Sequence, residues 1–166
     1  LDRIAAAQGF ERIELIDGEL IPISPKGNRH ELIKCDLNMD WVRRCPPDMI
    51  VIPETTLRLS PDTYLEPDFV IFPRRVGFRK LDGRSVLLAV EVADSSLAYD
   101  RGRKAKLYAK YGISEYWLLD VPGRTLEIRR QPAADGYGTT LRPAAGELIA
   151  PAALPDCAID WAQIFA

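Results

Sequence analysis

The sequence predicts a single α/β (α+β) domain over residues 1–166, built on a mixed β-sheet with helices on its faces. The length of 166 residues is typical of one domain. The most continuous apolar run, at 86–93, is typical of a strand buried on both faces. A helical pattern over 101–111 and a second apolar strand at 115–120 follow it. This strand–helix–strand order predicts a right-handed crossover between parallel strands.

Turn residues and apolar periodicity predict the remaining elements. Asp17-Gly18 predicts a tight turn in a β-hairpin over 11–23. A helix over 29–44 is expected to end at Cys45-Pro46-Pro47, with an apolar face formed by Ile33, Leu37 and Trp41 and extended by Leu32 and Met39. The other expected elements are strands at 49–52, 55–59 and 68–72, a basic loop at 73–85, the helix at 101–111 capped by Asp100 and ended by Gly112, a strand pair at 115–120 and 125–130, and C-terminal weak strands with a short helix capped by Asp160.

Composition excludes several classes of protein. Hydrophobic residues make up 47% and charged residues 28%, as in ordinary globular proteins. A net charge of −2 excludes a protein that coats nucleic acid by bulk charge. One histidine and three scattered cysteines exclude a Cys/His zinc site and predict the reduced thiols of a cytoplasmic protein. No stretch has the length of a membrane span, and residues 1–20 lack a signal-peptide pattern, so no membrane partner is expected.

Two carboxylates lie in otherwise apolar strands. Glu91 interrupts the run 86–93, and Asp68 opens the strand 68–72. A hairpin connection would make these strands antiparallel, so the start of one meets the end of the other at the same edge of the sheet. Two half-buried carboxylates repel each other, and a divalent cation such as Mg²⁺, with Mn²⁺ as an alternative, resolves the conflict. Taken singly, Asp68 could merely open a turn and Glu91 could pair with an arginine.

A lysine on the following helix is expected to join these carboxylates. Lys104, Leu107, Tyr108 and Tyr111 share a helical stripe, which places Lys104 on the sheet-facing side. The alternative is that its ammonium group extends to solvent. An Asp, a Glu and a Lys at one edge suit phosphodiester hydrolysis, because a bound metal activates water and a lysine stabilises developing negative charge.

These residues resemble the PD-(D/E)XK nuclease superfamily and, more closely, its Uma-two family (domain of unknown function 820) of restriction-endonuclease-like proteins. The resemblance covers about residues 10–130 and rests on ELIDGEL at 14–20, Ser24-Pro25 with His30, LEPDFVIF at 65–72 and the long block at 90–120. It implies a restriction-endonuclease-like fold with an αβββαβ core after the N-terminal hairpin, and Asp68 and Glu91 as the metal-binding pair.

The sequence departs from the superfamily pattern at one position. Ala93 stands where the motif has its lysine, and the family resemblance transfers that role to Lys104, with Lys106 as an alternative. The resemblance also makes His30 a candidate catalytic residue that could contact phosphate or water, although a packing role is equally open. Glu14 and Glu19 match family motif positions but could face solvent on the hairpin, and Glu31 is a further candidate.

Local positive charge predicts DNA as the partner. The basic loop 73–85 and the run from Arg101 to Lys110 are expected to surround the site and attract a phosphate backbone, with Arg101, Arg103 and Lys106 as the candidate nucleic-acid-binding residues. A homodimer would double this groove. The sequence thus predicts a Mg²⁺-dependent endodeoxyribonuclease. The alternatives are a catalytically inactive module that binds nucleic acid or protein, and a purely structural Glu91–Lys104 ion pair.

Overall fold

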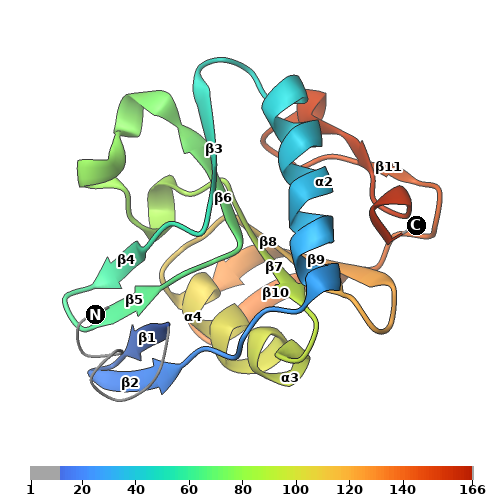
Figure 1. Cartoon of the computed structure of the whole chain (residues 1–166). Helices are drawn as coiled ribbons and strands as arrows, with labels where there is room; N and C mark the ends of the chain where they lie inside the picture. The colour runs from blue at the N-terminus through green and yellow to red at the C-terminus, as the bar shows by residue number, and fades with distance from the viewer. Residues whose placement is uncertain (1–11, 166) are drawn as a thin grey trace.

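A six-stranded mixed sheet forms the centre of the computed structural model, which describes residues 12–165 (Figure 1). Its strand order is β10-β9-β8-β7-β6-β3, and a second sheet has the order β2-β1-β5-β4. The elements are β1 (Ile13–Ile16), β2 (Glu19–Pro22), α2 (Asn28–Arg44), β3 (Met49–Pro53), β4 (Leu57–Ser60), β5 (Thr63–Leu65), β6 (Phe69–Pro73), β7 (Leu88–Ala93), α3 (Leu97–Tyr99), α4 (Ala105–Lys110), β8 (Glu115–Asp120), β9 (Thr125–Ala133), β10 (Gly136–Leu141), β11 (Leu148–Ile149) and β12 (Ile159–Asp160).

The strand directions confirm the predicted mixed sheet. β6 and β7 are antiparallel, and Phe69 pairs with Val90. β7 and β8 are parallel, and Val90 pairs with Trp117, so the helical segment between them is a crossover. Every residue of β7 is buried, as expected for a strand covered on both faces.

The two faces of the central sheet are covered by different elements. On one face, α2 and the C-terminal segment pack on the sheet, and Trp41 meets Phe69 edge-on with ring centroids 5.4 Å apart. On the other face, α4 and the small sheet share a core that contains Tyr108 and Ile16. Figure 1 shows α2 running across the sheet, with α3 and α4 near the hairpin β1–β2.

The hairpin and α2 follow the prediction closely. Asp17 and Gly18 have φ values of 49° and 82°, the left-handed conformations that a two-residue hairpin turn requires. Residue 11 of the predicted hairpin lies outside the described residues. α2 begins one residue before its predicted start, and Ile33, Leu37 and Trp41 are buried as expected. Leu32 and Met39 are exposed, so they do not belong to the core-facing stripe.

The predicted helix 101–111 begins earlier than expected. Helical structure starts at Leu97 in α3, passes through a π-helical turn at Asp100–Lys104 and continues as α4. Asp100 is therefore not a helix cap, and its carboxylate instead accepts a hydrogen bond from the Ser96 hydroxyl. Gly112 follows the helix with a φ of 82°, which confirms the predicted end.

The less periodic segments differ more from expectation. The predicted strand 55–59 is β4, and its partner β5 was not predicted. β9 runs to Ala133 and forms a hairpin with β10, which was not predicted as a defined strand. The C-terminal helix is one short 3-10 turn at Gln163–Phe165. Among the described residues, no helix is long and apolar enough to cross a membrane.

Candidate active site

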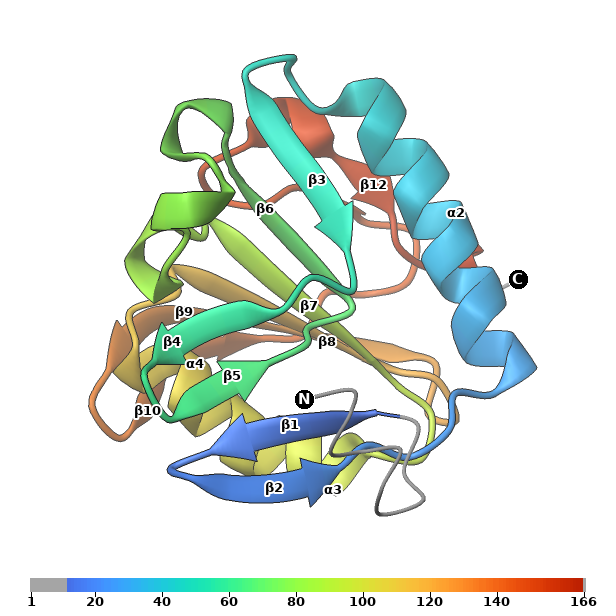
Figure 2. The ribbon, with the colours of Figure 1, turned by 60° about the vertical axis from the view of Figure 1, so that its left-hand side comes forward.

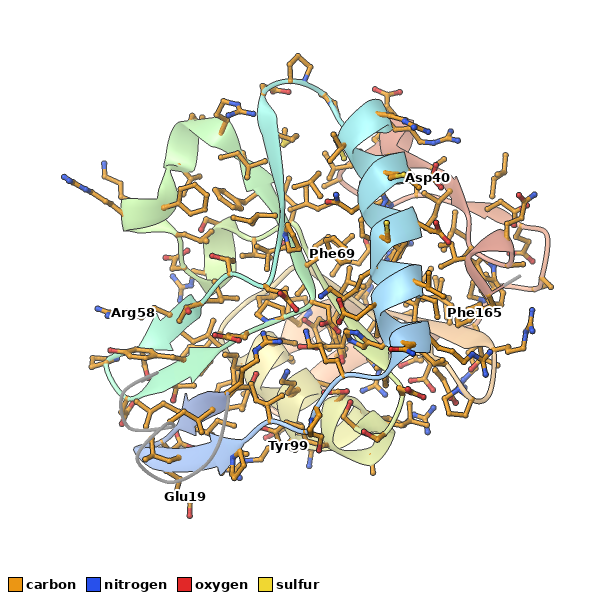
Figure 3. All side chains as sticks on the ribbon, viewed as in Figure 1. Glu19, Asp40, Arg58, Phe69, Tyr99 and Phe165 are labelled. Carbon is orange, nitrogen blue, oxygen red and sulfur yellow. The ribbon has the colours of Figure 1, made fainter. Side chains whose placement is uncertain are left out.

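A cavity of about 300 Å³ lies beside the ends of β1 and β7 and the start of β6. Six carboxylates line it together with an arginine and two lysines, namely Glu14, Glu66, Asp68, Glu91, Asp94, Asp100, Arg12, Lys26 and Lys104. In Figure 3, nitrogen and oxygen atoms gather between the labelled Phe69 and Tyr99. The cavity is thus strongly polar, although it lies close to the apolar core.

Strand register places Asp68 beside Glu91. Phe69 pairs with Val90, so the residue before Phe69 lies opposite the residue after Val90. The side chain of Glu91 projects from the same face of β7 as Ala89 and Ala93, which pack towards α4. The backbone N–H of Val92 donates to Asp68 Oδ2 at 2.8 Å, which fixes the carboxylate against β7. The meeting of the two carboxylates at one sheet edge is therefore as predicted.

Asp68 is held by two nitrogen-bearing side chains. His30 Nε2 lies 3.0 Å from Asp68 Oδ2, and Lys26 Nζ lies 2.6 Å from Asp68 Oδ1. Burial alone would favour the neutral acid, but the His30 hydrogen bond and the Lys26 charge hold the pKa of Asp68 well below its ordinary value. Asp68 is therefore ionised at neutral pH. The other ring nitrogen of His30 lies 3.0 Å from Glu31 Oε1.

Glu91 and Lys104 form a buried ion pair. Glu91 Oε1 accepts from Lys104 Nζ at 2.8 Å and from the Tyr108 hydroxyl at 2.5 Å. Burial raises the pKa of Glu91 well above its ordinary value. The charge of Lys104 opposes this rise, and the carboxylates of Asp100, Asp68 and Glu14 add to it.

Lys104 is the shared cation of the cluster. Its Nζ lies 2.8 Å from Glu14 Oε1 and 3.9 Å from Asp100 Oδ1, in addition to its contact with Glu91. Burial would lower the pKa of Lys104, but these carboxylates raise it well above its ordinary value. Lys104 therefore stays charged. The predicted sheet-facing position of Lys104 is confirmed, and the alternative, in which its ammonium group extends to solvent, is wrong.

Sequence reasoning missed part of the cluster. Glu14 was left open between a family motif position and a solvent-facing one; it is buried and also accepts hydrogen bonds from the Glu66 backbone N–H and the Tyr99 hydroxyl. Lys26 lies in an irregular segment before α2, where no periodicity marks its direction. Glu19, in contrast, is exposed and pairs with Arg103 at 3.2 Å.

Lys26 also contacts a second carboxylate outside the cavity lining. Its Nζ lies 2.7 Å from Glu54 Oε1, and Lys34 Nζ lies 2.5 Å from the same oxygen. Burial opposes ionisation of Glu54, but hydrogen bonds from the two lysines lower its pKa to about 2. Glu54 adopts a left-handed φ of 52°, and its N–H donates to the Asp68 carbonyl. Glu54 therefore anchors Lys26 beside Asp68.

The predicted nucleic-acid-binding residues do not line the cavity. Arg101 pairs with Glu127 at 3.1 Å, Arg103 pairs with Glu19, and Lys106 is exposed on α4. The basic loop 73–85 was expected near the site, but it joins the opposite ends of β6 and β7. That placement follows from the hairpin itself, because its connection must lie at the end of the strands away from Asp68 and Glu91.

The donor set fits a magnesium ion that is only partly coordinated by protein. Within residues 12–165, no three His, Cys, Asp or Glu side chains form a group that could hold a metal ion. Asp68 and Glu91 offer one carboxylate each, and Mg²⁺ commonly binds through one or two carboxylates with waters and substrate phosphates. The cavity also has more carboxylates than lysines, so a divalent cation would relieve their repulsion.

A sequence model described as "Uma2: Putative restriction endonuclease" matches residues 3–162. The chain belongs to the Uma2 family. This confirms the family resemblance that the motifs indicated. No curated protein matches the chain.

Two solved structures are similar to this Uma2 protein. One is a "putative nuclease belonging to DUF820" from Anabaena variabilis, with a TM-score of 0.76, 16% identity, and coverage of 92% of this chain and 89% of that chain. The other is the type IIG restriction endonuclease BpuSI, with a TM-score of 0.43, 15% identity, and coverage of 69% and 14%. The first likeness confirms the restriction-endonuclease-like fold.

Proposed function

We propose that this Uma2 protein is a Mg²⁺-dependent endonuclease that hydrolyses phosphodiester bonds in DNA. The observation that supports this most is the placement of Asp68 and Glu91 side by side on antiparallel strands, with the buried cation Lys104 bound to Glu91 at 2.8 Å. Membership of a family described as "Putative restriction endonuclease" supports the same reaction class. Perturbed carboxylates beside a cavity are typical of catalytic sites.

Each residue of the cluster has a distinct proposed role. Asp68 and Glu91 would hold Mg²⁺, which when bound polarises the phosphate and lowers the pKa of a bound water. Lys104 has three N–H donors, and two point to Glu14 and Glu91. The third would stabilise the negative charge that develops on the phosphate. His30 is a positioning residue, because its Nε2 contacts Asp68.

The proposed DNA contact uses positive charge on the helix that follows the site. Arg103 and Lys106 lie on exposed helical positions within three residues of Lys104, whereas Arg101 is held near the ends of β8 and β9 by its pairing with Glu127. Electrostatic contacts of this kind do not read sequence and weaken as salt rises. The proposal therefore predicts salt-dependent binding to DNA.

The test combines metal binding with DNA cleavage. Mn²⁺ titration by calorimetry and plasmid nicking in the same buffer are compared for the wild type, for Asp68→Asn and for Asp156→Asn, an exposed acid remote from the cavity. We expect the wild type and Asp156→Asn to bind metal and nick DNA, and Asp68→Asn to do neither. Absence of metal binding by the wild type would refute the proposal.

One observation favours the inactive binding module as the second candidate. Lys26 Nζ lies 2.6 Å from Asp68 Oδ1, so an ammonium group already neutralises the oxygen that a metal ion would use. On this alternative, the wild type binds DNA without Mn²⁺ and does not nick it. Salt-dependent DNA binding that persists in a chelator, together with intact plasmid, would identify this case.

A further inference from the structure

The helical segment between β7 and β8 contains one widened turn. This π-helical turn, at Asp100–Lys104, separates α3 from α4. In a regular α-helix, each backbone N–H donates to the carbonyl four residues earlier. Here the N–H of Ala105 donates to the carbonyls of Asp100 and Gly102, and it passes over the carbonyl of Arg101. Such turns are frequent at functional sites, and this one ends at Lys104, the shared cation of the cavity.

Two side chains of the central sheet bind the carbonyls of this turn. Arg129 Nη1 donates to the Arg101 carbonyl at 2.9 Å, so it bonds the oxygen that the Ala105 N–H passes over. The Tyr116 hydroxyl donates to the Asp100 carbonyl at 3.1 Å. Tyr116 and Arg129 are register partners in β8 and β9, so their side chains project from the same face. One cross-strand pair therefore holds two successive carbonyls of the turn.

The Tyr116–Arg129 pair lies next to the row of residues that contains Glu91. Glu91 pairs with Leu118, which follows Tyr116 by two residues in β8, so Glu91 and Tyr116 point to the same side of the sheet. Figure 2 shows α4 beside β9 and β10, and α4 contacts both strands. The turn is thus fastened to β8 and β9, while Lys104 extends from it to Glu91 on β7 at 2.8 Å.

The guanidinium group of Arg129 is itself oriented by a buried carboxylate. Arg129 Nη2 donates to Glu127 Oε2 at 2.8 Å, and Arg142 donates to Glu127 Oε1 at 3.0 Å. The Arg129 side chain is 16% exposed, whereas that of Arg142 is 67% exposed. Among residues 12–165, Arg142 makes no hydrogen bond to the turn. The two arginines therefore share Glu127, but only Arg129 links it to the helix.

The width of the turn affects the direction of the side chains at its ends. An α-helix rotates by about 100° per residue, and a π turn contains one residue more than an α turn. Conversion to α geometry would therefore rotate the residues before the turn by about 100° against those after it. Asp100 and Lys104 are buried at its two ends and cannot both keep their contacts through such a rotation. The bond from Arg129 opposes it, because α geometry would return the Arg101 carbonyl to the Ala105 N–H.

We propose that Arg129, together with Tyr116, is a positioning residue that holds Lys104 against Glu91. Arg129 does not line the cavity, so it acts only through the turn. The consequence for catalysis rests on the proposed function, in which Lys104 stabilises negative charge that develops on the phosphate. Loss of Arg129 should then lower kcat more than it raises KM, because Asp68 and Glu91, on β6 and β7, keep their strand pairing.

The position of Lys104 is tested without metal or DNA, by NMR of the protein labelled with ¹⁵N-lysine. The measured quantity is the rate at which the Lys104 ammonium hydrogens exchange with water, and the signal is assigned by its loss in Lys104→Arg. We expect exchange to be faster by about threefold or more in Arg129→Met and in Tyr116→Phe, because both changes free the turn to open. Arg142→Met is the matched control, since it also removes an arginine from Glu127, and its rate should stay within about twofold of wild type.

Unchanged exchange in Arg129→Met or in Tyr116→Phe, or an equal increase in Arg142→Met, would overturn the proposal. Tyr116→Phe removes one hydroxyl and keeps the buried ring, so it still tests the turn if Arg129→Met does not fold. Arg129→Lys restores a donor at nearly the same reach and should return the exchange rate towards that of the wild type.

Plasmid nicking at saturating Mn²⁺ tests the catalytic consequence. We expect Arg129→Met to lower kcat by about tenfold or more with KM within about twofold, and Arg129→Lys to recover most of kcat. Faster Lys104 exchange with unchanged kcat, or a change in KM alone, would overturn this part. If the wild type does not nick DNA while the exchange rates change as expected, the proposed function fails and the positioning of Lys104 by Arg129 stands.

Discussion

Replacing Lys104 with methionine should destabilise the protein strongly while preserving its packing. Methionine has a similar length and no charge, so the apolar part of the side chain remains filled. Glu14 keeps its bonds from the Glu66 N–H and the Tyr99 hydroxyl, but Glu91 keeps only the Tyr108 hydroxyl. Breaking a buried ion pair by removing one partner costs about 3–5 kcal/mol. We expect a loss in that range at pH 7, measured by urea unfolding in a chelator.

The dependence on pH separates lost charge from lost packing. The pKa of Glu91 is already raised in the folded protein, and removal of Lys104 raises it further. A carboxyl group of this kind contributes full stability below its unfolded pKa of about 4.3 and loses it as pH rises through the folded pKa. The defect of Lys104→Met should therefore shrink towards pH 4 and grow towards neutrality.

Two further variants complete this test. Adding Glu91→Gln to Lys104→Met should recover most of the stability at pH 7, because a neutral amide needs no counter-ion. Lys106→Met, an exposed change two residues along the helix, should alter the free energy of unfolding by less than about 0.5 kcal/mol. A loss below about 1 kcal/mol for Lys104→Met, or a loss that does not change with pH, would refute the reasoning.

Three other outcomes are expected. Lys26→Met removes the ammonium group that lies 2.6 Å from Asp68 Oδ1, so Mn²⁺ should bind several-fold more tightly by calorimetry, and unchanged affinity would contradict this. Trp41→Ala empties a fully buried site beside Phe69 and should cost about 3–5 kcal/mol in urea unfolding, whereas a loss under about 2 would show that the site collapses easily. The stabilising pairing of Glu54 should be present above pH 4.5 and lost as pH falls through about 2, and a carboxyl-carbon NMR titration with a midpoint near 4.5 would disprove it.

The sheet could be predicted because its signals are local or follow from chain connectivity. Asp17-Gly18 marks a turn by its backbone conformation, and the apolar run at 86–93 marks a strand covered on both faces. A hairpin between 68–72 and 86–93 requires antiparallel strands, which brought Asp68 beside Glu91. β5 has only three residues, which are too few for an alternation of apolar and polar residues to distinguish a strand from a loop.

The rest of the site depends on tertiary packing that a periodicity cannot show. Glu14 is buried because β1 pairs with β5 near Tyr99 and Lys104, and nothing in the hairpin pattern specifies that docking. The direction of Lys26 is set by Asp68 and Glu54, which come from other segments. The metal-binding and catalytic roles of Asp68, Glu91 and Lys104 remain predictions.

The position of the loop between β6 and β7 has a consequence for engineering. β6 has five residues, so at about 3.4 Å per residue its far end lies about 17 Å from Asp68. The loop also carries Arg79 and Lys80 in an exposed turn that contributes no side chain to the cavity. A peptide tag or a fluorescent reporter inserted there should leave the carboxylate cluster intact, which makes this loop the permissive place to label or immobilise the protein.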